Sequence, residues 1–399
     1  MITAKLFKTV QFLYELVLAQ QELTAFEISF KIERNLKTFY LSDVADVHLL
    51  IKRLAYFETV GAKFTDYYWI SQQNVTRSIN QYLTHWIYPY KGKFHPQMVR
   101  ALLNILKLNK GDVVLDPFIG SGTTAIEAQL LGINCLGFDV SPLCVLQSNV
   151  KTKSLFALPQ IENMQQTAIQ TVSQFGLIKE EAFTPQFLSF LNTLSDKIAR
   201  DFYLMAGLIA LSDFIRRKRN IIKSFIKNLN LMIASLKMYQ KICKKLGLLL
   251  GNVVIEKGDA RSLPLKKNSV DGIITSPPYS IALDYVKNDA HALKALGYDL
   301  NRFRNECMGL RGKGKEKIHF YHEDLKQAIA EMFRVLRPRG KCAIIIGNAT
   351  YQGQKINTVA FLIDCCKELG FQPLLTIEKP IYGLYNIMQE EQIILLEKP

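Results

Sequence analysis

The segment Asp112-Val-Val-Leu-Asp-Pro-Phe-Ile-Gly-Ser-Gly-Thr123 gives the clearest indication of the fold of this 399-residue chain. Residues 112–116 are typical of a short buried strand, and Gly120 and Gly122 allow a tight turn before a helix that begins near Thr123. This alternation of strand and helix continues along the chain and predicts an α/β fold with a doubly wound parallel sheet, covered on both faces. The further strands are expected at 134–139, 252–256, 270–275, 342–347 and 392–396, and the further helices at 322–336 and 357–369.

Residues 1–75 read as a small separate unit. Apolar spacing predicts helices over about 6–17, 25–32 and 42–54, followed by a strand or hairpin at 63–70. Three helices and a strand pair resemble a winged helix, whose third helix would offer His48, Lys52 and Arg53 to DNA. A helical cap on the main domain is the equally weighted alternative.

The main domain, residues 82–153 and 252–399, is interrupted by a helical insertion at 154–251 that concentrates positive charge. The chain carries a formal net charge of +15, and the segment 214–245 holds ten basic residues and no acidic one. Such a segment suits a polyanion, because neutralisation of phosphates supplies most non-specific affinity for nucleic acids. A solvated helical face is the alternative. The candidate phosphate contacts are Arg216, Arg217, Lys218, Arg219 and Lys223, with Arg311 in a second basic loop at 302–317.

Composition argues against several classes of protein. The longest apolar run, 202–211, is half the roughly 20 residues that a membrane-spanning helix needs, so we expect a soluble, cytoplasmic protein without a membrane partner. The seven cysteines are scattered without metal-ligand spacing, which predicts reduced thiols and no metal site. The sequence gives no indication of the oligomeric state.

A cofactor site is predicted at the ends of the first two strands. Asp139 ends the second strand, where its carboxylate can accept hydrogen bonds from two ribose hydroxyls. Asp116, Pro117 and Phe118 separate the first strand from its glycines, unlike a dinucleotide site, and the Asp116 carboxylate would repel a pyrophosphate but attract an ammonium group. These features favour S-adenosylmethionine. Asp259, followed by Ala260, is placed to accept a hydrogen bond from the adenine amine.

The segment Thr275-Ser-Pro-Pro-Tyr279 predicts a site for an exocyclic base amine. The lone pair of such an amine is delocalised into the ring, and two acceptors placed on its hydrogens would free it for attack. Ser276 can supply a hydroxyl oxygen and Pro277 a carbonyl oxygen, and Pro277 and Pro278 make the loop rigid. Tyr279 offers a ring on which a flipped base can stack. A simple turn after a buried strand is the alternative.

Together these residues resemble the amino-group DNA methyltransferases, the site-specific enzymes that modify cytosine N4 or adenine N6. The resemblance covers about 82–151 and 252–399, and it includes the segment 90–97 before the first strand. It implies a Rossmann-like methyltransferase sheet, S-adenosylmethionine as cofactor, double-stranded DNA with base flipping as substrate, and a restriction endonuclease as a companion of such enzymes. It also implies that Phe118 packs beside the adenine and that the region of Lys93 and His95 closes the methionine end.

The resemblance favours one target base and leaves alternatives. Ser276 at the first tetrapeptide position is similar to the cytosine-N4 group, whereas aspartate prevails among adenine-N6 enzymes. The alternatives are an adenine-N6 enzyme, an RNA guanine or adenine amine methyltransferase, and a DNA-binding regulator with an inactive methylase fold. The helical insertion departs from the commonest layouts of the family, so the N-terminal unit and the loop at 302–317 are also candidates for reading the target sequence.

Overall fold

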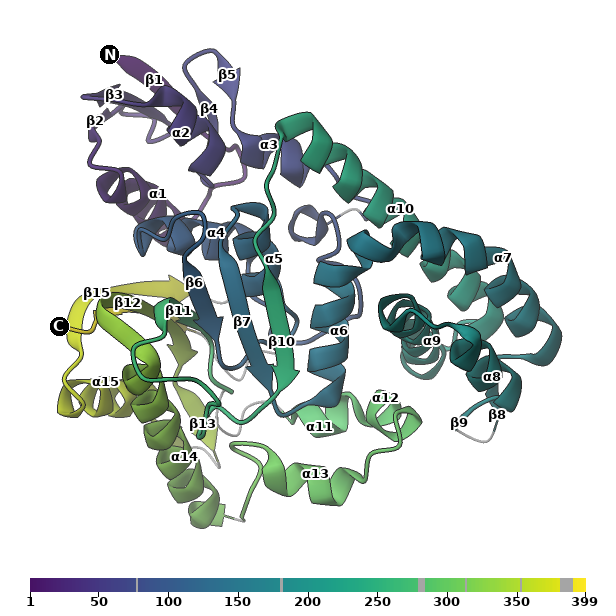
Figure 1. Cartoon of the computed structure of the whole chain (residues 1–399). Coiled ribbons are helices and arrows are strands. Elements are labelled where there is room, and N and C mark those ends of the chain that lie inside the picture. Colours follow the sequence, from purple (N-terminus) through teal and green to yellow (C-terminus); the bar gives the residue numbers. More distant parts are fainter. Residues whose placement is uncertain (77, 180–181, 279–283, 313, 352–353, 381–389) are drawn as a thin grey trace.

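A seven-stranded sheet forms the centre of the molecule (Figure 1). The computed structural model describes residues 1–76, 78–179, 182–278, 284–312, 314–351, 354–380 and 390–399. The strand order is β10-β7-β6-β11-β12-β16-β15, and β16 runs antiparallel to its neighbours while the other six strands are parallel. The strands are β6 (Val113–Asp116), β7 (Asn134–Asp139), β10 (Val253–Lys257), β11 (Val270–Thr275), β12 (Leu336–Gly347), β15 (Gln372–Pro380) and β16 (Glu390–Glu397). The predicted doubly wound α/β sheet is confirmed, and β15 is a strand that the sequence analysis missed.

The two faces of this sheet support two separate hydrophobic cores. Along β12, Ala343 and Ile345 belong to one core, whereas Ile344 and Ile346 belong to the other, because successive side chains of a strand point to opposite faces. Helices cover both faces, as a parallel sheet that is buried on both sides requires. The first core receives α4 (Pro96–Ile105) and α5 (Thr123–Leu130), and the second receives α14 (Gly314–Val335) and α15 (Thr358–Glu368).

The N-terminal unit is a five-stranded antiparallel sheet with three short helices, so the predicted arrangement of three helices and a strand pair is wrong. Residues 29–32, expected in a helix, form a strand because their side chains alternate between exposed and half-buried positions. Residues 66–71, expected in a strand, form a helix because the Thr65 hydroxyl accepts a hydrogen bond from the Tyr68 amide and caps its start. The elements are β1 (Ile2–Leu6), α1 (Leu13–Ala25), β2 (Ser29–Ile32), β3 (Thr38–Ser42), α2 (Val47–Arg53), β4 (Phe57–Val60), β5 (Lys63–Phe64) and α3 (Asp66–Ser71).

This unit packs on the main sheet and shares its first hydrophobic core. Helix α2, which corresponds to the expected DNA-reading helix, exposes His48 and Lys52 but buries Arg53. The Arg53 guanidinium donates to Asn104 Oδ1 at 2.7 Å and to the Leu108 carbonyl at 2.6 Å. Arg53 therefore joins the unit to the main domain and is not available to a nucleic acid.

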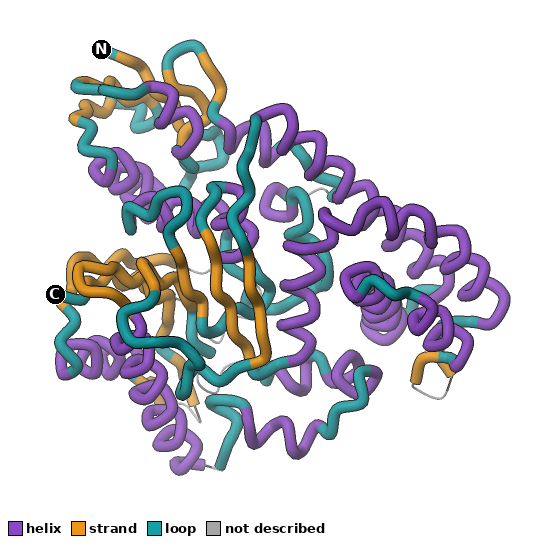
Figure 2. The backbone as a smooth tube through the Cα atoms, in the orientation of Figure 1, coloured by secondary structure: helices purple, strands orange, loops and turns teal. Residues whose placement is uncertain are grey.

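Residues 154–251 are largely helical, as predicted, and project from the edge of the sheet beside β10 (Figure 2). Their apolar residues form a core that also contains Val286, Leu293, Phe303 and Leu310 from the segment after β11. We call this later segment, residues 284–310, the wall. Insertion and wall are thus one packed body. Helix α6 (Pro142–Lys153) of the main domain leads into the insertion. The elements of the insertion and the wall are η2 (Ser154–Ala157), α7 (Leu158–Phe175), β8 (Ile178–Lys179), β9 (Ala182–Phe183), α8 (Pro185–Thr193), α9 (Lys197–Arg217), α10 (Ile221–Leu246), α11 (Tyr285–Asn288), α12 (Ala290–Ala295) and α13 (Leu300–Glu306).

Three short elements complete the fold, namely η1 (Ile79–Gln81), β13 (Ala349–Tyr351) and β14 (Gln354–Ile356). The basic segment 302–317, expected as a loop, is helical at both ends, since α13 ends at Glu306 and α14 begins at Gly314, and non-helical at 307–312 between them. Within the ranges given above, no helix combines the length and apolarity needed to cross a membrane. The seven cysteines are free thiols, five of them buried.

Candidate active site

The two predicted motifs lie at the same edge of the sheet. β6 and β11 are parallel neighbours, with Leu115 opposite Ile273, so the loops that follow Asp116 and Thr275 leave the sheet side by side. The Thr275 hydroxyl donates a hydrogen bond to Asp116 Oδ1 at 2.7 Å, and both side chains are buried. The order of the strands reverses between β6 and β11, which is where doubly wound sheets bind their ligands.

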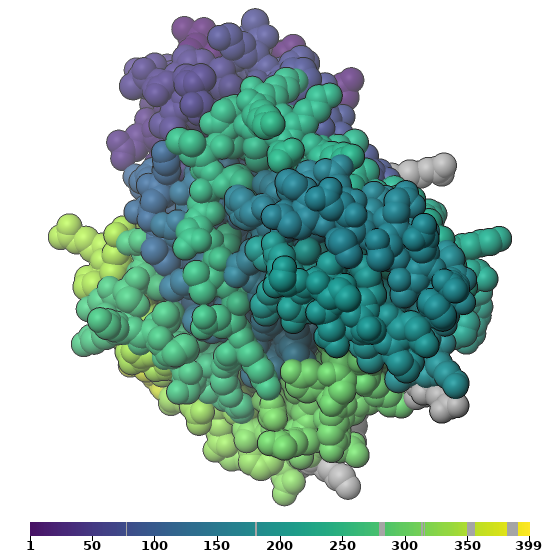
Figure 3. Space-filling model, turned by 45° about the vertical axis from the view of Figure 1, so that its right-hand side comes forward, coloured from purple at the N-terminus to yellow at the C-terminus, as the bar shows by residue number. Residues whose placement is uncertain are grey.

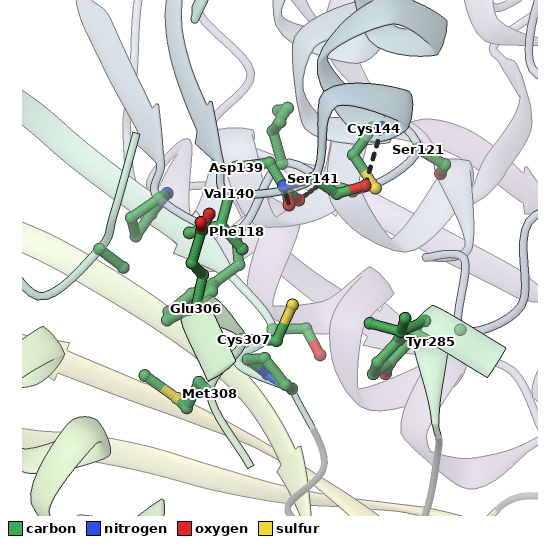
Figure 4. Close-up of a pocket in the computed structure, with 18 of the residues that line it drawn as sticks. Phe118, Ser121, Asp139, Val140, Ser141, Cys144, Tyr285, Glu306, Cys307 and Met308 are labelled. Atoms are coloured by element: carbon green, nitrogen blue, oxygen red, sulfur yellow. Dashed lines mark hydrogen bonds between the residues drawn. The ribbon is translucent and has the colours of Figure 1, made fainter. Parts of the chain in front are cut away.

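One pocket opens at this edge and is lined by residues of both motifs and of the wall (Figure 4). Of the predicted site residues, those that line it are Pro117, Phe118, Gly120, Asp139, Asp259, Ala260, Ser276 and Pro278. Those that do not line it are Lys93, His95, Asp116, Gly122 and Pro277. Tyr279 lies outside the described residues. The structure thus brings the predicted ribose, adenine and amine contacts around one cavity.

Asp116 is buried beneath the pocket rather than exposed to it. Besides the Thr275 hydroxyl, its carboxylate accepts the Thr124 hydroxyl at 2.7 Å and the Phe118 amide at 3.2 Å. Burial raises the pKa of Asp116 to about 6, against the opposing effect of these donors. The carboxylate therefore joins the start of α5, the turn after β6 and the end of β11, and so fixes the two loops relative to each other.

Asp139 lines the pocket at the end of β7, where the sequence placed the ribose contact. Its Oδ2 accepts the Gly120 amide at 3.0 Å and its Oδ1 accepts the Ser141 amide at 2.8 Å. Burial raises the pKa of Asp139 to about 6. Each oxygen of an ionised carboxylate accepts more than one hydrogen bond, so a carboxylate held in this way can still accept the hydroxyls of a ligand.

The glycine turn needs glycine at position 122 for two reasons. Gly122 has a φ of +78°, which disfavours other residues, and a Cβ there would lie 2.8 Å from the Ser148 Oγ of α6. Helix α6 also holds the turn by hydrogen bonds, from Ser148 Oγ to the Gly120 carbonyl at 3.0 Å and from Lys151 Nζ to the Ser121 carbonyl at 2.8 Å. The turn is thereby clamped between β7 and α6.

Asp259, the predicted adenine contact, lines the pocket but is also an ion-pair partner. Arg261 donates to both oxygens of its carboxylate, with an Nη2 to Oδ2 distance of 2.6 Å and Nε contacts of 2.9 and 3.0 Å. Burial would raise the pKa of Asp259, but the hydrogen bonds and charge of Arg261 lower it on balance. Arg261 also donates to Asp324 of α14 at 2.8 Å. The carboxylate is therefore rigidly placed, and its free accepting capacity is reduced.

Lys93 and His95 lie in the segment before α4, away from the pocket lining. Lys93 Nζ donates to the His85 carbonyl, and burial lowers the pKa of Lys93 to about 7. His95 Nε2 lies 2.7 Å from Asn80 Nδ2, and burial lowers the pKa of His95 to about 4. The part of this segment that does line the pocket is Tyr90, Gly92 and Phe94.

The wall contributes pocket residues that the sequence analysis missed. The rings of Tyr285 and Tyr90 are stacked, with centroids 6.2 Å apart. Glu306 and Cys307 lie across the cavity from Tyr285 (Figure 4), and Glu306 Oε2 is 3.6 Å from Lys257 Nζ. These residues carry no motif, because their position depends on packing against the insertion. In the segment before α4, the aromatic content of 88–94 is a signal that could have indicated the pocket lining.

The basic turn between α9 and α10 follows Arg216, a residue of α9 that contacts this wall. In Figure 3 the teal atoms of the insertion lie directly above the green atoms of the segment after β11. Arg216 Nη2 donates to Asp289 Oδ1 at 3.0 Å, and Asp289 lines the pocket. Arg217 and Arg219 both pair with Asp213 Oδ1, at 2.9 and 3.3 Å, although each remains about half exposed. Lys218 and Lys223 are exposed, and Arg311 pairs with Asp324 at 2.5 Å. Several of the predicted phosphate contacts are therefore engaged within the protein.

Comparison with known proteins supports the resemblance to a family. Residues 32–149, which include the glycine turn and Asp139, match the family model described as DNA methylase, N6_N4_Mtase. The chain is thus similar to the amino-group DNA methyltransferases. This methyltransferase is 31% identical over 121 residues to the type II methyltransferase M.MjaII of Methanocaldococcus jannaschii, a match that covers 30% of this chain and 22% of that protein. It is 24% identical to the type II methyltransferase M.BsoBI of Geobacillus stearothermophilus over 79% of this chain and 82% of that protein.

A solved structure is also similar over part of the methyltransferase. The putative DNA modification methylase TTHA0409 of Thermus thermophilus, complexed with S-adenosyl-L-methionine, has 22% identity to it and a TM-score of 0.23, over 36% of this chain and 54% of that one. The fold assignment rests on the sheet described above.

The residues around the pocket fit S-adenosylmethionine, the cofactor that the sequence predicts. Asp139 offers fixed acceptors for hydroxyls, and Phe118 offers an apolar ring. Gly122 precedes α5, and within the described chain no side chain caps that helix, so its first amides are available to a carboxylate. Ser121 and Thr123 line the pocket at this point.

Proposed function

We propose that this enzyme transfers a methyl group from S-adenosylmethionine to the exocyclic amine of a base in double-stranded DNA, and that the base is cytosine, methylated at N4. The observation that carries the proposal is the hydrogen bond between Thr275 and Asp116, which holds the amine loop directly beside the cofactor turn. Ser276, from the amine loop, and Phe118, from the cofactor turn, consequently line the same cavity. The cofactor and the target amine would therefore be held close together, as methyl transfer requires.

The residues of the chain account for the chemistry. When bound, the cofactor supplies a methyl group on a cationic sulfur, and the carbon–sulfur bond breaks as the carbon–nitrogen bond forms. The Ser276 hydroxyl and the Pro277 carbonyl accept the hydrogens of the target amine, which shifts electron density toward its nitrogen. Pro277 and Pro278 keep these acceptors in place because their φ angles are fixed. The amine loses one proton to solvent after transfer, and no covalent intermediate with the enzyme is needed.

The proposed DNA surface is the basic turn between α9 and α10. Lys218 and Lys223 are exposed there, and Arg217 and Arg219 remain half exposed beside them. Because Arg216 joins this turn to Asp289 at the pocket, phosphates bound by the turn would lie close to the cavity that receives a flipped base. The insertion is therefore our candidate for target recognition. A companion restriction endonuclease stays a prediction.

The choice of cytosine N4 as the methylated position rests on Ser276, the first residue of the tetrapeptide. The test is to incubate the enzyme with labelled S-adenosylmethionine and either duplex DNA or transfer RNA, and to identify the modified nucleoside by mass spectrometry. We expect N4-methylcytosine in DNA. N6-methyladenine would overturn the choice of base, label in RNA alone would overturn the choice of substrate, and DNA binding without any transfer would indicate a regulator.

A further inference from the structure

Tyr321 of α14 forms a contact with the amine loop that no motif assigns. Its side chain is fully buried, and its hydroxyl donates a hydrogen bond to the Pro278 carbonyl at 2.9 Å. The two residues are 43 positions apart in the chain. This bond links a helix on one face of the sheet to the backbone of the loop that is proposed to hold the target amine.

Two residues of the loop cannot anchor its backbone by donating hydrogen bonds. Pro277 and Pro278 have no amide hydrogen, so neither can donate the backbone hydrogen bond that normally anchors a turn. Their φ angles are fixed, and the orientation of the following peptide is the remaining freedom. A donor on the Pro278 carbonyl restricts that orientation.

The described residues of the loop, 276–278, are held by two buried hydroxyls. Before it, the Thr275 hydroxyl is bonded to Asp116, and at its third residue the Pro278 carbonyl is bonded to Tyr321. Between these two points lie Ser276 and Pro277, the proposed acceptors of the amine hydrogens. The two bonds restrict the orientation of both residues, of which Ser276 lines the pocket.

Helix α14 is itself fixed to the cofactor side of the pocket. Asp324, one turn after Tyr321, accepts hydrogen bonds from Arg261 at 2.8 Å and from Arg311 at 2.5 Å. Arg261 in turn holds Asp259 and donates to the Glu306 carbonyl at 3.1 Å. This turn of α14 therefore ties the amine loop to the adenine side of the cavity.

We propose that Tyr321 is a positioning residue for methyl transfer, acting through its hydrogen bond to the Pro278 carbonyl. This inference rests on the proposed function, because it concerns the geometry of the amine acceptors. Tyr321 orients the loop without contacting the base or the cofactor, and its hydroxyl therefore affects the rate of transfer rather than the affinity for either ligand.

The test compares two tyrosine variants that each lose one buried hydroxyl. Tyr321→Phe removes the bond to Pro278. Tyr203→Phe is the matched control, because Tyr203 is also fully buried and its hydroxyl donates to the Ile161 carbonyl within the insertion. We expect Tyr321→Phe to lower kcat about tenfold, as the loss of one hydrogen bond felt in the transition state would, with the KM and Kd of S-adenosylmethionine unchanged. Tyr203→Phe is expected to keep the wild-type kcat.

The outcomes distinguish this inference from the proposed function. Wild-type enzyme that methylates DNA in the same assay supports the proposed function, and a wild-type kcat in Tyr321→Phe would then overturn the role of Tyr321 alone. Equal falls in kcat and in cofactor affinity would also overturn it, because they indicate general structural damage. Incorporation of p-aminophenylalanine at position 321 restores a donor, and we expect it to recover most of the rate; no recovery would count against the hydrogen bond.

Discussion

The edge of the sheet and the helical insertion use their polar residues in different ways. At the edge, each motif residue lies at the end of a strand, and the register between β6, β7 and β11 brings these ends together. In the insertion, the charges lie along helices, and their partners depend on which helix packs against which. Arg216 pairs with the wall, whereas Lys218 and Lys223 are exposed. Position at a strand end therefore predicts where a side chain lies better than membership of a charged run does.

The strongest test of the sheet edge is Ser276→Ala. We expect kcat to fall about 100-fold, because one hydrogen-bonding partner of the reacting amine is lost. Calorimetry should find the affinity for S-adenosylmethionine unchanged. Ser269→Ala is the control, since Ser269 lies at the opposite end of β11 and bonds to the Lys266 carbonyl. Turnover at the wild-type rate in Ser276→Ala would rule out the proposed amine site.

Replacement of Asp139 should affect the cofactor instead. In Asp139→Asn we expect the Kd of S-adenosylmethionine to rise about 30-fold, which corresponds to about 2 kcal/mol for hydrogen bonds to a charged acceptor. Asp112→Asn is the matched control. Asp112 lies at the opposite end of the sheet, and its carboxylate accepts a hydrogen bond from the Asn109 amide. Titration calorimetry that finds no difference between the two variants would reject the ribose contact.

The affinity for the cofactor should depend on pH through the same carboxylate. Burial raises the pKa of Asp139 to about 6, so the ionised form that accepts two hydroxyls is lost as the pH falls through this value. We expect the Kd to be constant above about pH 7 and about tenfold higher near pH 5. Asp116 has a similar pKa, and the Asp139→Asn variant separates the two. A variant with the full wild-type pH dependence would show that Asp139 is not the group responsible.

The smallest expected effect concerns the insertion. Replacing both Lys218 and Lys223 by Gln should reduce the slope of log K against log salt for DNA binding by up to about 1.8, or about 0.9 for each phosphate contact. Arg216→Gln should leave the slope unchanged, because this guanidinium is already paired with Asp289. Fluorescence anisotropy at several salt concentrations measures both slopes. If Arg216→Gln changes the slope more than the double variant does, the insertion binds DNA differently from our proposal.

The sequence predicts the sheet well, and it places several predicted residues at one edge of it, because these signals are local. An apolar run followed by Asp116 or Thr275 identifies a strand and its end, and parallel pairing then places the ends together. The N-terminal unit was predicted less well, because its short segments have ambiguous spacing and pair with distant strands. Ile2–Leu6, for example, forms a strand through pairing with β3 and β4, which no local pattern indicates.

The wall could not be predicted for a related reason. Tyr285, Asp289 and Glu306 reach the pocket because the segment that carries them shares a hydrophobic core with the insertion, whose packing depends on contacts far apart in the sequence. Asp259 illustrates the same limit, since its position was predicted but its ion pair with Arg261 was not. Spacing along the chain identifies a residue at the site, but it does not identify that residue's neighbours.

The attachment of the insertion has a consequence for how such enzymes can diversify. The chain leaves the sheet through α6 and returns at β10, an outermost strand, so recombination at these two points would exchange the whole segment without altering the pairing of β6 with β11. The shared core, however, means that residues 284–310 would have to be inherited together with it. Chimeras that exchange both segments should fold, whereas those that exchange 154–251 alone would expose the apolar side of the pocket.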